Sequence, residues 1–217
     1  MAKYNILLFD LDGTLTDPKV GITKAVQYAL AKFGIIEEDL DKLEVFIGPP
    51  LLDSFEEYYS FDDTKSKEAI LYYREYFSTK GIFENEIYEG MDSMLKELKS
   101  TNKKLIVATS KPTEFAIRIL KHFNIYDCFD MVIGSNFDGT RTSKEEVIEY
   151  VLENIPNLKK EELVMIGDRK YDICGAKEKG IDSIGVSYGY GSFDELKEAG
   201  PLYIFDSVDK LKSFLLK

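Results

Sequence analysis

The sequence FDLDGTLTD at residues 9–17 places two aspartates, Asp10 and Asp12, directly after an apolar run. Residues 6–9 predict a buried strand, and side chains two residues apart in an extended chain point the same way. The two carboxylates therefore converge on one small volume, where each raises the pKa of the other unless a positive charge offsets them. A bound divalent cation would supply that charge and give the pair a chemical use.

Two further aspartates follow another apolar run, residues 163–166. Asp168 and Asp172 are four positions apart at the expected start of a helix, so they share one face. Ligands of open parallel sheets bind beyond the carboxyl ends of the strands, which brings these acids to the edge that holds the first pair. Acids that only decorate a helix start are the alternative. Oxygen ligands favour Mg²⁺, and the expected ligands are Asp10, Asp12, Asp168 and Asp172.

Three residues at the same edge have the character of an anion site. Gly13 lets the backbone approach a ligand closely, and successive N–H groups in such a turn bind anions. Thr109 and Ser110 follow the apolar run 104–108 and precede a helix, so hydroxyl and N–H groups face the same region. We expect these three residues to contact an anion such as phosphate, although an Asp-Gly turn and an ordinary helix cap are the alternatives.

Lys144 occupies a helix position that is electrostatically unfavourable for a cation. Ser143 and Glu146 form an S-x-x-E capping box, which puts Lys144 in the first turn, where the helix dipole disfavours a cation. Such local conflicts are expected at functional sites. We therefore expect Lys144 to bind an anion at the end of the sheet, with a solvated surface lysine as the alternative.

The elements that position these residues alternate between strands and helices. Apolar runs that predict buried strands are 104–108, 131–133, 163–166, 183–186 and 202–205. Apolar residues at helical spacing predict helices at 91–99, 114–123, 145–153 and 171–179. This alternation predicts an α/β fold with a parallel sheet flanked by helices.

Residues 16–81 interrupt the alternation with helices only. The expected helices are 18–33, with Asp17 as a possible N-cap, then 51–59 and 65–77. Tyrosines and phenylalanines at helical spacing in this segment indicate core packing rather than a ligand cage. We expect a helical cap at 16–81, inserted into an α/β core made of 1–15 and 82–217.

Composition limits the class of partner. The 217-residue chain is 44% hydrophobic and has a net charge of −11, without a long basic block, so an extended nucleic acid is disfavoured while a small anionic substrate is not. The sequence has no 18-residue apolar run and its first residues lack the basic and apolar regions of a signal peptide, so we expect neither a signal peptide nor membrane association. Cys128 and Cys174 match no metal or disulfide pattern and indicate two buried thiols in the cytoplasm.

Taken in order, these motifs resemble those of the haloacid dehalogenase superfamily. They are DLDGT at 10–14, Thr109-Ser110, Lys144, and Gly167-Asp168 with Asp172. The resemblance covers essentially the whole chain and implies a Rossmann-like core with an inserted helical cap of type one. The segment IGPPL at 47–51 is similar to phosphoglycolate-phosphatase-like proteins, and some relatives of that kind are labelled 5'-nucleotidases.

The resemblance also implies a role for each matching residue. Asp10 would attack phosphorus and become an aspartyl phosphate, while Asp12 would protonate the leaving group and then activate water. Asp10, the backbone carbonyl of Asp12 and Asp168 would hold Mg²⁺, with Asp172 ligating or orienting it. Thr109 and Lys144 would hold the phosphoryl oxygens. The implied function is a Mg²⁺-dependent phosphatase acting on a small phosphomonoester similar to phosphoglycolate.

Several alternatives stay open from the sequence. A 5'-nucleotidase or a phosphomutase would use the same phosphorylated aspartate, and a phosphonate hydrolase would need a cap lysine such as Lys19, Lys24 or Lys32. A phospho-acceptor module without turnover is the non-enzyme alternative. The substrate is a small phosphorylated metabolite in each enzyme reading, and the chain is expected to act as a monomer or a homodimer.

Overall fold

The computed structural model describes residues 4–156 and 158–217. Within them the chain forms two compact units. The core unit runs to Asp17 and resumes at Ile87, and the helical unit is Pro18–Glu86. The expected cap was 16–81. Short strands β2 (Thr16–Asp17) and β3 (Glu86–Ile87) form a two-stranded sheet where the chain passes between the units, and this accounts for the later boundaries.

The core unit contains the predicted parallel sheet. Its strands follow the order β5-β4-β1-β6-β7-β8, and each neighbouring pair is parallel. The bounds are β1 Ile6–Phe9, β4 Lys104–Pro112, β5 Met131–Ser135, β6 Leu163–Gly167, β7 Asp182–Val186 and β8 Tyr203–Phe205. The expectation of an α/β, Rossmann-like fold is confirmed.

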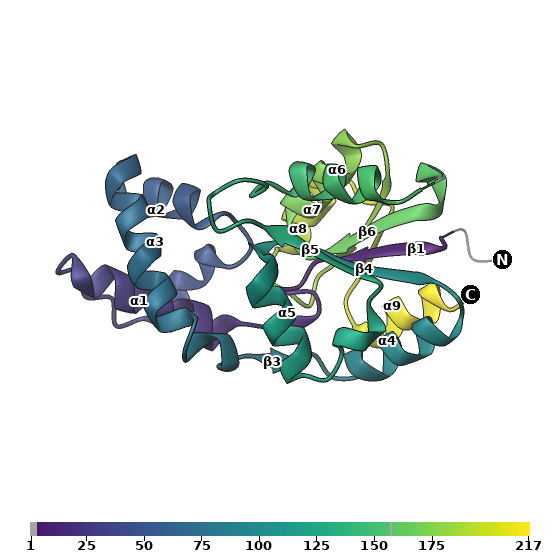
Figure 1. Cartoon of the computed structure of the whole chain (residues 1–217), viewed down its shortest axis with the longest axis horizontal. Helices are drawn as coiled ribbons and strands as arrows, with labels where there is room; N and C mark the ends of the chain where they lie inside the picture. Colours follow the sequence, from purple (N-terminus) through teal and green to yellow (C-terminus); the bar gives the residue numbers. More distant parts are fainter. Residues whose placement is uncertain (1–3, 157) are drawn as a thin grey trace. The chain divides into compact units, whose positions relative to one another are not determined.

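Helices cover both faces of this sheet. In Figure 1, α6, α7 and α8 lie on one side of the strands and α4, α5 and α9 on the other. Their bounds are α4 Met91–Ser100, α5 Thr113–His122, α6 Lys144–Asn154, α7 Lys170–Glu178, α8 Phe193–Ala199 and α9 Val208–Leu215, with 3₁₀ turns η3 Tyr126–Cys128 and η4 Lys160–Glu162. The helices expected from the sequence do not include α8 and α9, which are among the shorter helices.

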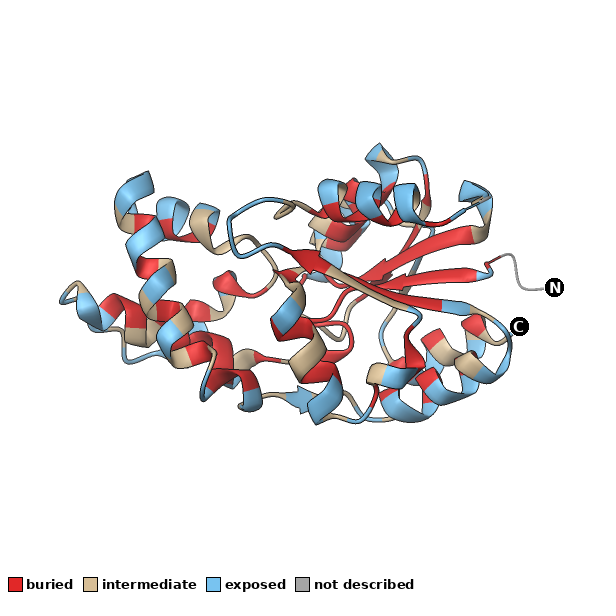
Figure 2. Cartoon of the chain, in the orientation of Figure 1, coloured by how far each residue is buried: buried red, intermediate tan, exposed pale blue. Residues whose placement is uncertain are grey.

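The hydrophobic core follows from the alternation of side chains along the strands. Ile6 and Leu8 of β1 pack with Val147 and Ile148 of α6 in one buried cluster. Leu7 and Phe9 point to the opposite face, because successive residues of a strand alternate, and both are fully buried. Figure 2 shows the central strands buried along their length. Because β1 is packed on both faces, the backbone position of Asp10, the next residue, is well defined.

The helical unit contains α1 Lys19–Lys32, α2 Leu51–Tyr59 and α3 Asp63–Phe77, with 3₁₀ turns η1 Leu40–Phe46 and η2 Gly81–Phe83. Its aromatic side chains pack on one another as expected. Phe55 is fully buried and stacks on Phe61 with ring centroids 5.8 Å apart. No helix among the described residues combines the length and apolar character needed to cross a membrane.

The cysteine expectation is half wrong. Cys128 is buried, but Cys174 is exposed on α7. The helix periodicity turns Cys174 outward, because Ile173 and Ala176 supply the buried side of α7.

Candidate active site

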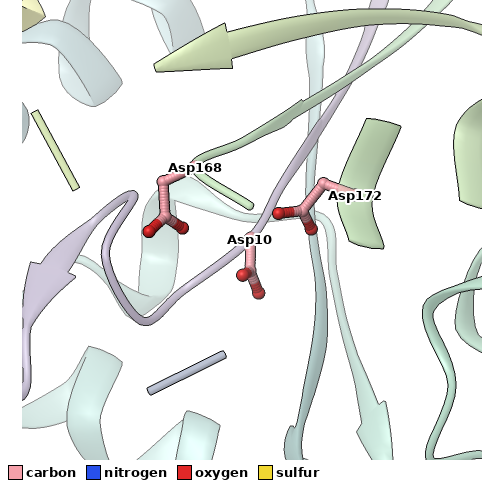
Figure 3. A group of neighbouring side chains, drawn as sticks. All are labelled: Asp10, Asp168 and Asp172. Carbon is pink, nitrogen blue, oxygen red and sulfur yellow. The ribbon is translucent and has the colours of Figure 1, made fainter. Parts of the chain in front are cut away.

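Three aspartates meet at the carboxyl ends of two adjacent central strands. Asp10 follows β1 and Asp168 follows β6, which pair in register with Phe9 opposite Ile166. Asp172 comes from the first turn of α7. One carboxylate oxygen from each lies within 4.8 Å of the others, and all three residues are buried. Figure 3 shows the three carboxylates gathered around one small space.

Lys144 lies between two of these acids. Its Nζ is 2.8 Å from Asp10 Oδ1 and 2.8 Å from Asp172 Oδ1, and it donates to the Ala108 carbonyl at 3.1 Å. Burial opposes the charge on Lys144, but the two carboxylates outweigh it and raise the pKa of the ammonium. The residue is 4% exposed, so the alternative of a solvated lysine is excluded.

A capping box fixes the start of the helix that carries Lys144. The Glu146 N–H donates to Ser143 Oγ and the Ser143 N–H donates to a Glu146 carboxylate oxygen, both at 3.3 Å. The predicted box is confirmed. It satisfies two N–H groups that the first turn leaves unpaired, and thereby holds Lys144 at the edge of the sheet.

A second buried ammonium accompanies Asp12. Lys111 Nζ lies 2.7 Å from Asp12 Oδ2, with both side chains almost fully buried. Burial raises the pKa of Asp12, and Lys111 offsets only part of that rise. Asp12 Oδ1 is also buried and has no hydrogen-bond partner among the residues that the structure describes. Lys111 was not among the expected site residues, although it directly follows Thr109-Ser110 at the end of an apolar run.

The charge balance of the site fits a divalent cation. Four carboxylates are buried here against only the two ammoniums of Lys111 and Lys144, which leaves two negative charges when all six groups are ionised. Burial and the neighbouring Asp172 and Asp10 carboxylates raise the pKa of Asp168 well above its usual range. Hard oxygen donors of this kind suit Mg²⁺. Asp10, Asp168 and Asp172 could hold such an ion with their carboxylates.

Asp168 is held from two sides. Thr14 Oγ1 donates to Asp168 Oδ1 at 3.2 Å, and the backbone N–H of Tyr190 donates to Asp168 Oδ2 at 2.8 Å. These bonds satisfy one lone pair on each oxygen and fix the orientation of the carboxylate. Such support of a metal-binding carboxylate is typical of metal sites.

Glycines let the backbone pack directly against Asp168. A Cβ on Gly13 would lie 2.2 Å from Asp168 Oδ2, and one on Gly189 would lie 2.3 Å from the Gly13 carbonyl oxygen. A Cβ on Gly191 would lie 1.9 Å from the Asp168 carbonyl oxygen. The site residues expected from the sequence do not include the segment 188–191, whose signal is the YGYG pattern just after the apolar run 183–186.

Tyrosine hydroxyls hold the turn that follows the first aspartates. Tyr188 donates to the Thr14 carbonyl at 3.1 Å, and the Tyr190 hydroxyl donates to Asp17 Oδ1. The expected N-cap, Asp17, is wrong, because Pro18 occupies the N-cap position of α1.

The remaining expected phosphate-binding residues lie along the same edge. Thr109 is buried next to Ala108, whose carbonyl binds Lys144, and its Oγ1 accepts a bond from the Lys111 N–H at 3.3 Å. Ser110 is half-buried on the same strand. The Gly13 N–H donates to the Thr16 carbonyl at 2.8 Å, so contact of Gly13 with phosphate stays a prediction.

Comparison with known proteins identifies relatives over nearly the whole chain. The profile of haloacid dehalogenase-like hydrolases matches residues 7–186. A 5'-nucleotidase of Pseudomonas aeruginosa is 46% identical over 98% of this chain and 96% of its own length. A crystal structure described as a predicted phosphatase from Clostridium acetobutylicum is 52% identical, with a TM-score of 0.95 over 98% of both chains.

Two more distant relatives carry other names. Tyrosine-protein kinase PtkA of Mycobacterium tuberculosis is 34% identical over 97% of this chain and 72% of its own length. A phosphoglycolate phosphatase of Colwellia psychrerythraea is 29% identical over 97% of this chain and 96% of its own length.

The close packing of Gly189 against Asp168 gives a testable prediction. In Gly189→Ala the added methyl group must displace Asp168 or the Gly13 turn, so we expect the affinity for Mg²⁺, measured by calorimetry, to fall about 10- to 100-fold. The matched control is Gly185→Ala on β7, where the new Cβ would meet Leu196 at an ordinary 3.4 Å. Unchanged Mg²⁺ affinity in a folded Gly189→Ala protein would show that this loop does not position Asp168.

Proposed function

The chain belongs to the haloacid dehalogenase-like hydrolases, and we propose from this that it is a phosphatase that hydrolyses a small phosphomonoester through a phosphorylated Asp10. The observation that carries the proposal is the pair Asp10 and Asp12 at the end of β1, each beside its own buried lysine. The expectation of an enzyme is confirmed by the family and by relatives named 5'-nucleotidase and phosphoglycolate phosphatase.

Asp10 is the proposed nucleophile. A carboxylate oxygen of Asp10 forms a bond to phosphorus while the bond from phosphorus to the leaving oxygen breaks. Lys144 holds the Asp10 carboxylate and places a positive charge where the phosphoryl oxygens gather negative charge. A divalent cation bound by Asp10, Asp168 and Asp172 would supply further neutralisation of that charge.

Asp12 is the proposed acid and base. The leaving oxygen receives the bonding electron pair and takes a proton from Asp12. In the second step Asp12 accepts a proton from water as the water oxygen bonds to phosphorus and the bond to Asp10 breaks. A buried carboxyl whose pKa is raised suits the first role, because it can carry the proton that it donates.

The phosphoryl oxygens are assigned to Lys144, Thr109, Ser110 and the Gly13 turn. Lys144 is supported by its charge and its place between two acids of the site. The assignment of Thr109 is supported by its burial beside Ala108. The helical unit, Pro18–Glu86, is proposed as the cap that selects the substrate, as the family resemblance implies.

The phosphonate hydrolase alternative receives no support from the lysines of the helical unit. A lysine that forms a Schiff base needs a lowered pKa. Instead the neighbouring groups raise the pKa of each candidate ammonium: Asp41 acts on Lys19, Glu84 on Lys24 and Tyr28 on Lys32.

The proposed substrate class is a nucleoside 5'-monophosphate. The relative named a 5'-nucleotidase is 46% identical, whereas the phosphoglycolate phosphatase is 29% identical, and both cover nearly the whole chain. The nucleotidase alternative therefore has more support than the phosphoglycolate-like substrate expected first. Both substrates fit the same phosphoryl chemistry at Asp10.

A panel of phosphate esters tests this proposal. We expect multiple turnovers, measured as release of inorganic phosphate, with nucleoside 5'-monophosphates faster than 2-phosphoglycolate. A phosphomutase would move phosphate within a sugar phosphate without releasing it, and a phospho-acceptor module would stop after one turnover. Transfer from ATP to a tyrosine peptide, without ester hydrolysis, would instead favour the activity named for the kinase relative.

The acid cluster predicts dependence on a metal ion. EDTA should abolish phosphate release, and Mg²⁺ should restore it better than Ca²⁺, which is larger and tolerates looser geometry. Asp168→Asn should raise the Mg²⁺ concentration for half-maximal rate by about tenfold or more. The control Asp206→Asn removes an exposed acid outside the site and should leave the Mg²⁺ concentration for half-maximal rate unchanged. Full activity in EDTA would refute the metal assignment.

Substitution of Asp10 and of Asp12 is expected to affect different steps of the reaction. Asp10→Asn should form no phosphoenzyme on any substrate. In Asp12→Asn the rate of hydrolysis should fall about 100-fold or more for alkyl phosphates, whose leaving groups need a proton donor. The rate of the first step should fall much less for p-nitrophenyl phosphate. Because its second step lacks a base, labelled phosphate should accumulate on Asp10, trapped by rapid quench and located by peptide mapping. Label on another residue would contradict the mechanism.

A further inference from the structure

We propose that Lys111 is a positioning residue that fixes the Asp12 carboxylate so that Oδ1 is the oxygen that exchanges the proton with the leaving group. The inference rests on the proposed function of Asp12 as acid and base. It assigns a role to a buried ammonium for which neither the sequence motifs nor the phosphoryl chemistry accounts.

The two oxygens of Asp12 have different surroundings. Oδ2 lies 2.7 Å from Lys111 Nζ, whereas Oδ1 is buried without a hydrogen-bond partner among the described residues. A buried oxygen without a partner costs free energy. A hydrogen bond from a substrate oxygen would offset that cost, and we therefore assign the proton exchange to Oδ1 rather than to the paired Oδ2.

The backbone around Lys111 is shaped to place its side chain. Pairing between β4 and β5 is regular to Ala108 and resumes only at Pro112, so residues 109–111 leave the regular ladder. Irregularities of this kind re-aim side chains next to active sites. On the neighbouring strand a Cβ at Gly134 would lie 2.2 Å from the Lys111 carbonyl oxygen, so only glycine allows this path.

Each of the two neighbouring aspartates has a different lysine as its partner. Lys144 contacts Asp10 and Lys111 contacts Asp12. Without the Lys111 ammonium the Asp12 carboxylate can rotate about its χ angles, and the proton is no longer held on the line to the leaving oxygen. Loss of orientation should slow only the reactions in which the leaving oxygen requires that proton.

The test is a leaving-group series in Lys111→Met, which keeps most of the length of the side chain and removes the charge. We expect kcat/KM to fall about tenfold or more for alkyl phosphates and less than about threefold for p-nitrophenyl phosphate. Lys111→Arg, which restores a cation, should recover part of the alkyl rate. Lys104→Met, at the exposed beginning of the same strand, is the matched control and should behave as wild type.

A double variant separates positioning from direct substrate binding. In an Asp12→Asn background, Lys111→Met should cause no further loss in the alkyl-to-aryl rate ratio, because the residue through which it acts is already disabled. If Lys111→Met does not fold, the same comparison is made with Lys111→Arg, whose altered reach should lower the ratio in the wild-type background and leave it unchanged in Asp12→Asn.

The outcomes distinguish the inference from the proposed function. Equal losses on alkyl and aryl esters, or a full additional loss in the Asp12→Asn background, would overturn the positioning role while the phosphatase proposal stands. Wild-type protein that releases no phosphate from any ester would overturn the proposed function, and the inference with it.

Discussion

Lys144 lies with its ammonium nitrogen 2.8 Å from a carboxylate oxygen of Asp10 and 2.8 Å from one of Asp172, in a place where almost no water reaches. This contact makes it possible to bury several acids side by side at the end of a sheet. An unpaired buried charge is expensive, whereas a paired and hydrogen-bonded one is tolerated. When all four carboxylates and both lysines are ionised, the site carries two excess negative charges, and a divalent cation could balance them.

Strand order decides which residues share that environment. β1 lies between β4 and β6, so the ends of these three neighbouring strands carry Asp10, Lys111 and Asp168 respectively. α6 and α7 then bring Lys144 and Asp172 in from their first turns. These five residues therefore meet although they come from three strand ends and two helix starts, which is the general advantage of the carboxyl edge of a parallel sheet.

Backbone groups of the loop after β7 pack directly against one of the acids of the site. The segment 188–191 packs on Asp168, donates one N–H to it and carries the tyrosines that hold the preceding turn. Glycine at 13, 189 and 191 is a steric requirement of this packing, since a Cβ at each position would overlap other atoms. The acids and lysines of the site are buried, and burial strengthens the charge interactions between them.

The sequence alone predicted the alternating strands and helices, the helical insertion and the acids at 10, 12, 168 and 172, because hydrophobic periodicity and short-range spacing are local properties. It also identified the capping box before Lys144. It did not predict the contact of Lys111 with Asp12, the bond from Tyr190 to Asp17 or the packing of Gly189 on Asp168. Each of these joins residues that are distant in sequence or re-aimed by an irregular strand, and only the tertiary structure decides which of the possible partners comes within bonding distance.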